Sequence, residues 1–338
     1  MLATFALLIT ASPASAQKRS VINVSGLEYS SDPNARAYYN YVPPSNQSLA
    51  AIKTNGFWGI RLPISEEQLQ PDPVKAAKGI LNESYVSVVI DTATRAQRIG
   101  LTVIIDIHNY GQYYGNNISL TSSTDKTRDI RAMYLGVVGS LAKRLQGAGV
   151  WGLSVTNEPH AMSVADVQSV EQDAVNTARA AGFRGYLFVD DAGWATASDG
   201  IQITVRDPSG TTCYDVHAYG DGNGSGTYKV PYAQDIDIST GNRVNADTIV
   251  NRIAPAVNQA KREKRCLFIG EIGAPLADPG RRQQVINAAN YLKNNGVDWA
   301  YWVSGEWTGN DQNSLQSALT SSTSSAARQF LVTLPNNR

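Results

Sequence analysis

Two glutamates, Glu158 and Glu271, lie near the ends of separate apolar runs of the chain, where a strand is expected to end and a loop to begin. No cofactor-binding motif accompanies them. Paired carboxylates without a cofactor are the groups that hydrolyse glycosidic bonds, because one carboxylate acts at the anomeric carbon while the other protonates the leaving oxygen. The sequence therefore predicts glycoside hydrolysis with these two glutamates as the catalytic pair and with no cofactor.

Other polar and aromatic residues occupy the same kind of position, at the end of an apolar run. The chain has three histidines: two are found at run ends, and the third, His160, lies two residues after Glu158. Random placement would scatter such scarce residues over helices and loops. Besides the glutamates, the residues at run ends are Arg61, Asp106, His108, Asn157, His217, Tyr219 and Trp302.

The two glutamates need different protonation states at the working pH, since one must be ionised while the other carries a proton. A guanidinium such as that of Arg61 would keep its neighbouring glutamate ionised. Retention of the anomeric configuration requires the two carboxyl groups to stand about 5–5.5 Å apart, and inversion requires about 6.5–9.5 Å. The residue pattern alone leaves both outcomes open.

Metal binding is the main chemical alternative, because two glutamates and two histidines could chelate zinc. No His-x-x-x-His or His-Glu-x-x-His spacing supports it, and the glutamates come from separate runs, so no metal is expected. Activity that survives chelation would exclude a metal-dependent hydrolase. A glycan-binding protein without activity is a further alternative, which the complete set of catalytic residues disfavours.

These residues require a scaffold that gathers several run ends at one place. Helix-like segments alternate with the apolar runs and are expected at 47–55, 83–100, 127–148, 163–181, 247–264, 280–296 and 312–331. The eight runs are Val21–Tyr29, Trp58–Ile64, Leu101–His108, Val150–Glu158, Gly185–Ala192, Cys213–Tyr219, Cys266–Ala274 and Val297–Gly305.

Eight strands that are joined by crossovers favour parallel pairing, because parallel neighbours need a long return connection. The simplest closed arrangement is a single α/β domain with the (β/α)8 TIM-barrel fold, in which active sites lie at the carboxyl ends of the strands. A doubly wound open sheet is the competitor, and it should show a glycine-rich dinucleotide turn after an early strand. The only glycine cluster, 220–226, follows the sixth run and is expected to be a surface loop.

The segment 163–181 illustrates how a helix is predicted. Ser163 can cap its start, and apolar residues follow at helical spacing from Val164 to Ala178. Gly182 then ends it.

The composition excludes several other classes of protein. The chain has 29 basic and 29 acidic residues among 338, which argues against a nucleic-acid binder. Residues 1–16 read as a secretory signal peptide with an Ala-Ser-Ala cleavage pattern, although no basic residue precedes the apolar stretch. The expected product is one secreted, monomeric catalytic domain, 17–338, with no membrane span.

Two cysteines, Cys213 and Cys266, lie near the starts of the sixth and seventh runs. Neighbouring parallel strands are about 4.8 Å apart, so the sulfur atoms could meet at the base of the barrel. A disulfide is expected, and two buried free thiols are the alternative.

Tyrosine is unusually frequent, with 16 residues against 6 tryptophans and 6 phenylalanines. Tyr29, Tyr38, Tyr39 and Tyr41 follow the first run, and Tyr110, Tyr113 and Tyr114 follow the third. Several of them are expected to line a sugar cleft, since aromatic rings pack on the apolar faces of sugars. The alternative is that they pack the two long loops.

An ordered series of motifs resembles glycoside hydrolase family 5, in its branch of cellulase-like endo-β-1,4-glucanases. The series covers most of the chain after residue 16, and its order and spacing make it specific. The motifs are Gly26–Tyr29 (GLEY), Gly56–Pro63 (GFWGIRLP), Asp106–Gly115 (DIHNYGQYYG), Asn157–His160 (NEPH), Asp215–Tyr219 (DVHAY), Gly270–Pro275 (GEIGAP) and Tyr301–Gly305 (YWVSG).

The resemblance implies a retaining mechanism on a β-linked polysaccharide, with Glu158 as acid/base and Glu271 as nucleophile. It also implies that Asn157 bonds the sugar 2-hydroxyl and that Arg61 and Tyr219 support the nucleophile. The remaining implied contacts are His108 and His217 at the central subsite, Trp302 beneath the sugar at the cleavage point, and further aromatic contacts from Trp194, Tyr110 and Trp307.

The chain departs from the family pattern after the eighth run, in the segment 305–310. Glu306 stands where proline is expected and Thr308 where a second tryptophan is expected, and earlier Ala218 replaces a larger polar residue. These departures leave the preferred glycan open: mannan, xyloglucan and β-1,3/1,6-glucan are alternatives to cellulose. Glu306 could favour a basic glycan, or it could be an exposed loop carboxylate.

Overall fold

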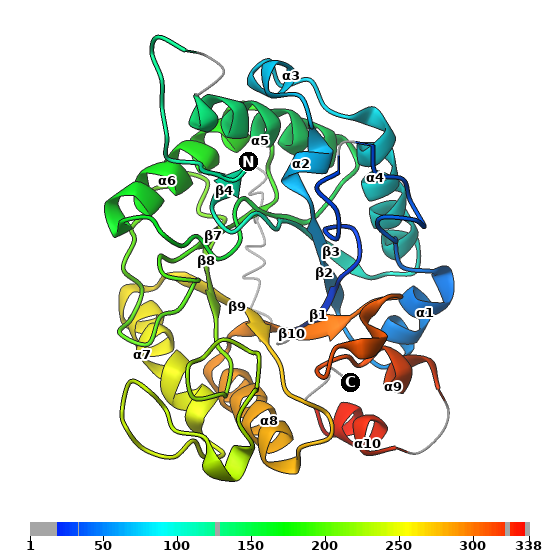
Figure 1. Cartoon of the computed structure of the whole chain (residues 1–338), viewed down its shortest axis with the longest axis vertical. Coiled ribbons are helices and arrows are strands. Elements are labelled where there is room, and N and C mark those ends of the chain that lie inside the picture. The colour runs from blue at the N-terminus through cyan, green and yellow to red at the C-terminus, as the bar shows by residue number, and fades with distance from the viewer. Residues whose placement is uncertain (1–18, 33, 126–128, 322–324, 335–338) are drawn as a thin grey trace, which may run out of the picture.

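The computed structural model describes residues 19–32, 34–125, 129–321 and 325–334, and in it eight parallel strands close into a barrel (Figure 1). The order around the barrel is β1-β10-β9-β8-β7-β6-β3-β2, which confirms the predicted (β/α)8 fold. Each of the eight apolar runs overlaps one barrel strand. The strands are β1 Ser20–Val24, β2 Gly59–Ile64, β3 Thr102–Ile107, β6 Gly152–Ser154, β7 Tyr186–Asp190, β8 Thr212–His217, β9 Cys266–Ile272 and β10 Asp298–Ser304.

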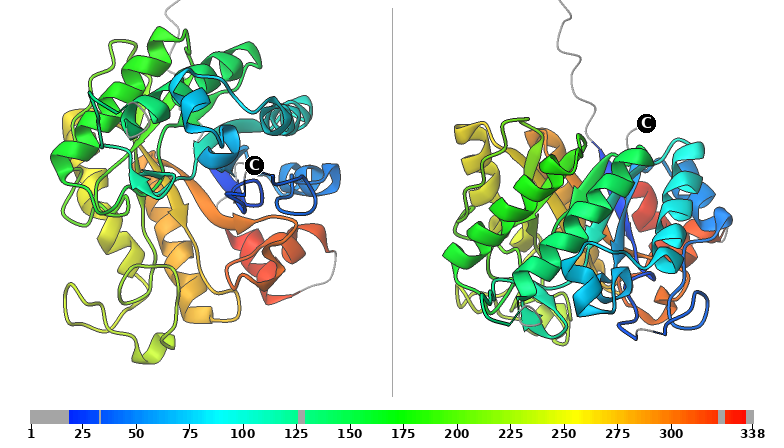
Figure 2. Two further views of the ribbon diagram at one scale, coloured as in Figure 1. Left: turned by 45° about the horizontal axis from the view of Figure 1, so that its top comes forward. Right: turned by 90° about the horizontal axis from the view of Figure 1, so that it is seen from above.

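Helices surround the barrel and bury one face against it (Figures 1 and 2). The six predicted segments from 47–55 to 280–296 each contain one helix. The surrounding helices are α1 Asn46–Thr54, α4 Glu83–Arg98, α5 Ile130–Gly147, α6 Val164–Ala180, α7 Thr248–Glu263, α8 Pro279–Asn295, α9 Gln316–Thr320 and α10 Ala326–Thr333. No helix among the described residues is long and apolar enough to cross a membrane.

The start of α6 follows the predicted pattern. Ser163 caps the helix by accepting a hydrogen bond from the backbone N–H of Asp166, and Val167 and Ala178 are buried. Val164 is exposed, contrary to the expected core position, because it lies in the first turn on the outer side. The backbone reverses at Gly182, which has a φ of 92°.

One connection differs from the sequence prediction, and a second, for which no helix was predicted, agrees with it. The segment 312–331 was expected to be one helix but forms α9 and α10, with Ser325 capping the second helix; serine competes for backbone groups and favours caps over helix interiors. Residues 191–211, between β7 and β8, contain no helix. There the Asp191 carboxylate accepts hydrogen bonds from the backbone N–H groups of Gln202 and Ile203, which stabilises an irregular path.

The loops after β2 and β3 carry small elements that the sequence pattern did not indicate. These are the short helices α2 Glu66–Leu69 and α3 Pro73–Ala77, and an antiparallel pair, β4 Gln112–Tyr113 and β5 Asn116–Asn117. Two 3-10 turns, η2 Tyr232–Gln234 and η3 Thr308–Asn310, lie after β8 and β10.

The barrel interior is built in layers, because inward-facing side chains alternate along each strand. A lower apolar layer contains Val21, Ile104, Phe188, Cys213, Phe268 and Ala300. Two residues further along their strands, Asn23, Asp106, Asp190 and Asp215 form a buried polar layer above it. The next inward positions after Asp106 and Asp215 are His108 and His217. The alternation thus places titratable groups at the carboxyl end of the barrel.

Cys213 and Cys266 form a disulfide between the amino ends of β8 and β9. Their Cα atoms are paired in the strand register and lie 4.4 Å apart. The bond is at the end of the barrel opposite the histidines, so it joins two strands without entering the site. The predicted signal peptide, 1–16, lies outside the described residues.

Candidate active site

A single buried guanidinium, that of Arg61 on β2, organises the polar layer. Its Nη1 lies 3.0 Å from Glu271 Oε1, and its Nη2 lies 3.1 Å from Asp106 Oδ1. It also donates hydrogen bonds to Asn23 Oδ1 (3.0 Å) and Asn157 Oδ1 (2.8 Å). The side chain is fully buried, so these bonds compensate a charge that water cannot reach.

Glu271 lies near the end of β9 with both carboxylate oxygens held. Oε1 faces Arg61 and Oε2 accepts a hydrogen bond of 2.6 Å from the Tyr219 hydroxyl. The register with β8 shifts by one residue between Val216 and His217, which places Glu271 opposite His217. A cation on one oxygen and a hydroxyl donor on the other fix the direction of the carboxylate. This geometry suits a carboxylate that attacks a carbon atom lying above it.

Gly270 makes room for the polar layer beside Glu271. A Cβ atom on this residue would lie 2.4 Å from Asp215 Oδ1. Any larger residue would push the buried Asp215 carboxylate away from the barrel axis, so the glycine before the glutamate is required by space.

Glu158 follows β6, and the neighbouring strand β7 supports its backbone. Its backbone has a φ of 45°, a conformation that is uncommon for a residue with a side chain. The Asp190 carboxylate on β7 accepts a hydrogen bond of 2.7 Å from the Glu158 backbone N–H, which supports this conformation. Burial raises the pKa of the Glu158 carboxyl to about 7. The group is thus suited to hold a proton near neutral pH.

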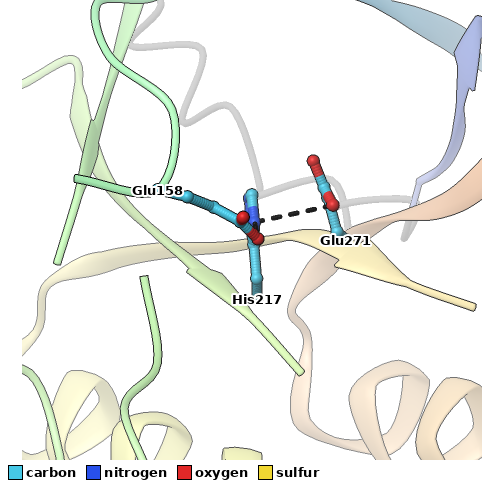
Figure 3. Close-up of side chains that lie close together, drawn as sticks. All are labelled: Glu158, His217 and Glu271. Carbon is cyan, nitrogen blue, oxygen red and sulfur yellow. Dashed lines mark hydrogen bonds and ion pairs between the residues drawn. The ribbon is translucent and has the colours of Figure 1, made fainter. Parts of the chain in front are cut away.

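The two glutamates converge on His217, as Figure 3 shows. His217 Nδ1 lies 2.8 Å from Glu158 Oε1 and 3.7 Å from Glu271 Oε2. One ligand atom from each of the three residues lies within 4.8 Å of the other two. Burial lowers the pKa of His217. The lowered pKa favours a neutral imidazole between the two carboxyl groups.

His108 lies on the other side of the site and is tied to the polar layer. Its Nδ1 is 2.8 Å from Asp106 Oδ2, and its Nε2 is 3.1 Å from the Tyr110 hydroxyl. Burial lowers the pKa of His108, but the hydrogen bond and charge of Asp106 outweigh this effect and the pKa is raised overall. The Trp302 indole stacks on the imidazole at 5.5 Å with an interplanar angle of 15°. The ring is therefore fixed on two sides.

Two adjoining cavities of about 490 and 560 Å³ lie above these residues. They share Glu158, Tyr110, Tyr219 and Ser225, so the acid/base candidate lies where they meet. The first cavity is also lined by His108, Gly226, Glu271, Trp302, Asn310, Asp311, Gln312 and Asn313. The second is also lined by Trp194, Thr196, His217, Asn223 and Gly224. Together they form a cleft that extends to both sides of the catalytic pair.

Trp194 forms the outer wall of the second cavity. Its ring stacks on His160 with centroids 3.7 Å apart and an interplanar angle of 6°. The third histidine of the chain therefore supports an aromatic wall and does not contact the carboxylates of the pair. Trp194 remains 49% exposed, so its free face is available to a ligand.

The tyrosines predicted for the cleft have divided roles. Tyr110 lines both cavities. Tyr113 is fully buried, stacks on Tyr114, and donates a hydrogen bond to the backbone oxygen of Gln70. Tyr41 is buried and packs edge-on against Tyr85. Of the seven tyrosines, Tyr110 alone lines these two cavities, so the expectation that several line the cleft is not confirmed, and the packing of the loops by Tyr41, Tyr113 and Tyr114 agrees with the alternative.

Glu306 has a role that the sequence did not suggest. Its Oε1 accepts hydrogen bonds from the Ser45 backbone N–H (2.8 Å) and the Ser48 hydroxyl (2.6 Å), at the start of α1. Burial raises its pKa, but the bonds from Ser48 and Ser45 outweigh burial and lower it overall. The carboxylate holds the loop after β10 to a helix N-terminus. It is neither a free surface charge nor directed at a ligand.

Sequence reasoning missed several residues of this site. Asn23 and Asp190 carry a detectable signal, since each lies two residues after an inward apolar position of its strand. Residues 310–313 have no recognisable signal in the sequence, because an irregular loop after β10 brings them over the first cavity. The glycine cluster 220–226 was expected to be a surface loop, yet it contributes to both cavities.

Within the part of the chain that the structure describes, two groups of three residues have ligand atoms close enough to hold a metal ion. One is Glu158, His217 and Glu271, and the other is Asp190, Asp215 and His217. In the first group the atoms are already engaged with one another and with Arg61 and Tyr219. A metal would have to displace these bonds, so the donor set fits acid–base chemistry better than metal binding.

Comparison with known proteins places these features in context. A sequence model described as Cellulase (glycosyl hydrolase family 5) matches residues 15–307. Endo-beta-1,4-glucanase B of Aspergillus niger is 26% identical over 295 residues, which cover 85% of this chain and 81% of that protein. Endo-beta-1,4-glucanase A of Emericella nidulans is 25% identical over 278 residues, covering 80% and 77%.

Solved structures show the same fold. Pseudomonas stutzeri endoglucanase Cel5A in complex with cellobiose aligns with a TM-score of 0.78 and 26% identity, covering 88% of this chain and 86% of that one. XacCel5A in complex with cellopentaose aligns with a TM-score of 0.80 and 18% identity, covering 94% and 99%.

Proposed function

The chain belongs to the cellulase family, glycosyl hydrolase family 5, and on that premise we propose that it is a retaining endo-β-1,4-glucanase that cleaves internal bonds of cellulose or a related β-glucan. The observation that carries the mechanism is the closeness of the two glutamates. An oxygen of Glu158 and an oxygen of Glu271 lie within 4.8 Å of each other. Retention needs carboxyl groups about 5–5.5 Å apart, whereas inversion must leave space for a water molecule between carboxylate and sugar.

The first step forms a glycosyl ester. Glu271 attacks the anomeric carbon, and the bond from that carbon to the leaving oxygen breaks as Glu158 delivers its proton to this oxygen. In the second step Glu158, now ionised, takes a proton from water, and the resulting hydroxide displaces Glu271 at the anomeric carbon. Both glutamates return to their starting states and one water is consumed.

Neighbouring residues support each step. Arg61 and Tyr219 orient Glu271, and His217 holds Glu158 toward the scissile bond. Asn157 is fixed through its oxygen by Arg61, while its buried Nδ2 has no hydrogen-bond partner among the described residues. This donor is suited to the sugar 2-hydroxyl, whose hydrogen bond strengthens in the transition state.

The aromatic residues give the cleft its preference for sugar rings. We assign Trp302 and His108 to the sugar on the Glu271 side, and Trp194 to the sugar on the leaving-group side, with Tyr110 between them. Among the described residues, no lysine or arginine lines either cavity, which suits an uncharged polymer. The relatives named endo-β-1,4-glucanase favour cellulose-type substrates over mannan, xyloglucan or β-1,3/1,6-glucan.

Export and a monomeric state remain part of the proposal. Residues 1–16 have the pattern of a signal peptide, and a disulfide between Cys213 and Cys266 suits an oxidising compartment.

Product analysis by NMR tests the proposal directly. We expect cellopentaose to yield the β-anomer first, with mutarotation following, and we expect the rate to be unchanged in a chelator such as EDTA. A panel with mannan, xyloglucan and mixed-linkage β-glucan ranks the substrates. Initial formation of the α-anomer, or loss of activity in the chelator, would overturn the mechanism.

The pH dependence follows from Glu158. Its carboxyl must be protonated for the first step, and burial raises its pKa to about 7. The free enzyme therefore holds the proton below this pH and loses it above. We expect kcat/KM for a soluble oligosaccharide to fall by about tenfold per pH unit on the alkaline side of that value. A profile that stays flat up to about pH 9 would contradict the assignment of the acid.

A further inference from the structure

The segment after β1 forms a closed loop at the carboxyl end of the barrel (Figure 2). The Val42 backbone N–H donates a hydrogen bond of 3.0 Å to the Gly26 carbonyl, which ties the two ends of the loop together. Gly26 permits this approach, because a Cβ atom there would lie 2.4 Å from the Val42 oxygen. Loops with joined ends are compact surface features that frequently carry function.

This loop presents two tyrosines to solvent. Tyr38 is 68% exposed and Tyr39 is 74% exposed, more than any other large aromatic side chain among the described residues. Tyr38 has a φ of 68°, and its backbone N–H donates a hydrogen bond to the Tyr41 carbonyl (2.6 Å). This turn fixes the backbone from which the two tyrosine side chains project. The Arg36 guanidinium lies 4.6 Å from the centre of the Tyr39 ring. Exposed apolar surface of this kind commonly marks a binding surface.

A second aromatic pair connects the loop to the cleft. Tyr29, at the start of the loop, stacks on Trp307 with ring centroids 6.3 Å apart and an interplanar angle of 22°. Both rings are 43% exposed. Trp307 directly precedes η3, and the residues at its end, Asn310 and Asp311, line the first cavity. This pair therefore connects the segment that lines the first cavity to the start of the loop.

We propose that Tyr38 and Tyr39 form a surface site that binds the β-glucan polymer outside the catalytic cleft. The proposal rests on the proposed function. A long β-1,4-linked chain that enters the cleft on the Glu271 side passes Trp307 and Tyr29 before it meets the loop. Its rings have flat apolar faces, which match uncharged aromatic rings. The site would hold a polymer at the protein but would not contact a short oligosaccharide bound across the catalytic pair.

The test compares binding to insoluble cellulose with turnover of cellopentaose. The double variant Tyr38→Asn/Tyr39→Ser retains a residue that tolerates positive φ at position 38. We expect its partition onto insoluble cellulose to fall roughly five- to tenfold, as for the loss of two stacking rings, while kcat/KM for cellopentaose stays within about twofold. Ile238→Ala is the matched control, because Ile238 is 76% exposed in the loop after β8; its adsorption should be unchanged.

Three results would overturn the proposal. They are unchanged adsorption of the double variant, an equal loss of cellopentaose turnover, and a wild-type dimer in sedimentation that the variant abolishes. The last would identify the surface as a contact between copies of the chain. A failure of the proposed function is separate, since the wild-type protein would then release no product from any β-glucan.

Discussion

Glu271→Gln should lower the turnover of β-glucan by about 10³-fold or more while leaving glycan binding nearly unchanged. An amide is a poor nucleophile, so the glycosyl ester cannot form. The shape of the side chain is preserved: the amide oxygen can take the place of Oε1 and accept from Arg61, while the amide NH2 can donate to the Tyr219 hydroxyl oxygen at the position of Oε2. The cleft walls formed by Trp302 and Tyr110 are not altered.

Two measurements distinguish a chemical defect from a folding defect. Single-turnover and steady-state rates on cellopentaose report the chemistry, and calorimetric titration with cellotetraose reports binding. Glu306→Gln is a suitable control, since Glu306 lies on the same face but bonds Ser45 and Ser48. We expect the control to keep most of its activity. Near wild-type turnover of the Glu271 variant would remove it from the role of nucleophile.

The parts of the fold that were predictable share a physical basis. Parallel barrel strands are buried on both faces, so they appear as continuous apolar runs that end abruptly in polar residues. This pattern located Glu271 and His217 at strand ends. Because the barrel closes, all of the carboxyl ends meet at one face, and scarce polar residues at those ends must converge. Helix caps such as Ser163 act locally, which explains why most helix bounds were also predictable.

The remaining features depend on contacts between distant segments. Asp190 matters because it accepts the backbone N–H of Glu158 from the neighbouring strand, and no local pattern encodes that bond. Glu306 caps α1 across more than two hundred residues of chain. The loop residues Asn310 and Asp311 reach the first cavity through an irregular path that has no periodicity. Residue propensities and sequence spacing carry no information about such contacts between distant segments.

The same dependence on distant contacts makes Arg61 the most consequential residue outside the catalytic pair. Arg61→Met would leave Asp106 and Glu271 buried without their shared cation. Removing one partner of a buried ion pair costs about 3–5 kcal/mol of folding free energy. We expect the free energy of unfolding in guanidinium chloride to drop by that amount, and kcat to fall by about 10²-fold or more because Glu271 and Asn157 lose their common donor.

Arg179→Met is the matched control for this prediction. Arg179 also pairs with a carboxylate, Asp207, at 2.8 Å, and it bonds the backbone of Gly185 near the amino end of β7, at the opposite end of the barrel from the cleft. Its loss should reduce stability while kcat of the folded protein stays within about twofold. Arg61→Lys separates charge from geometry: an ammonium retains the charge but cannot contact Glu271, Asp106 and Asn157 together. If Arg61→Lys kept full kcat, the planar fork of the guanidinium would not be what positions the nucleophile.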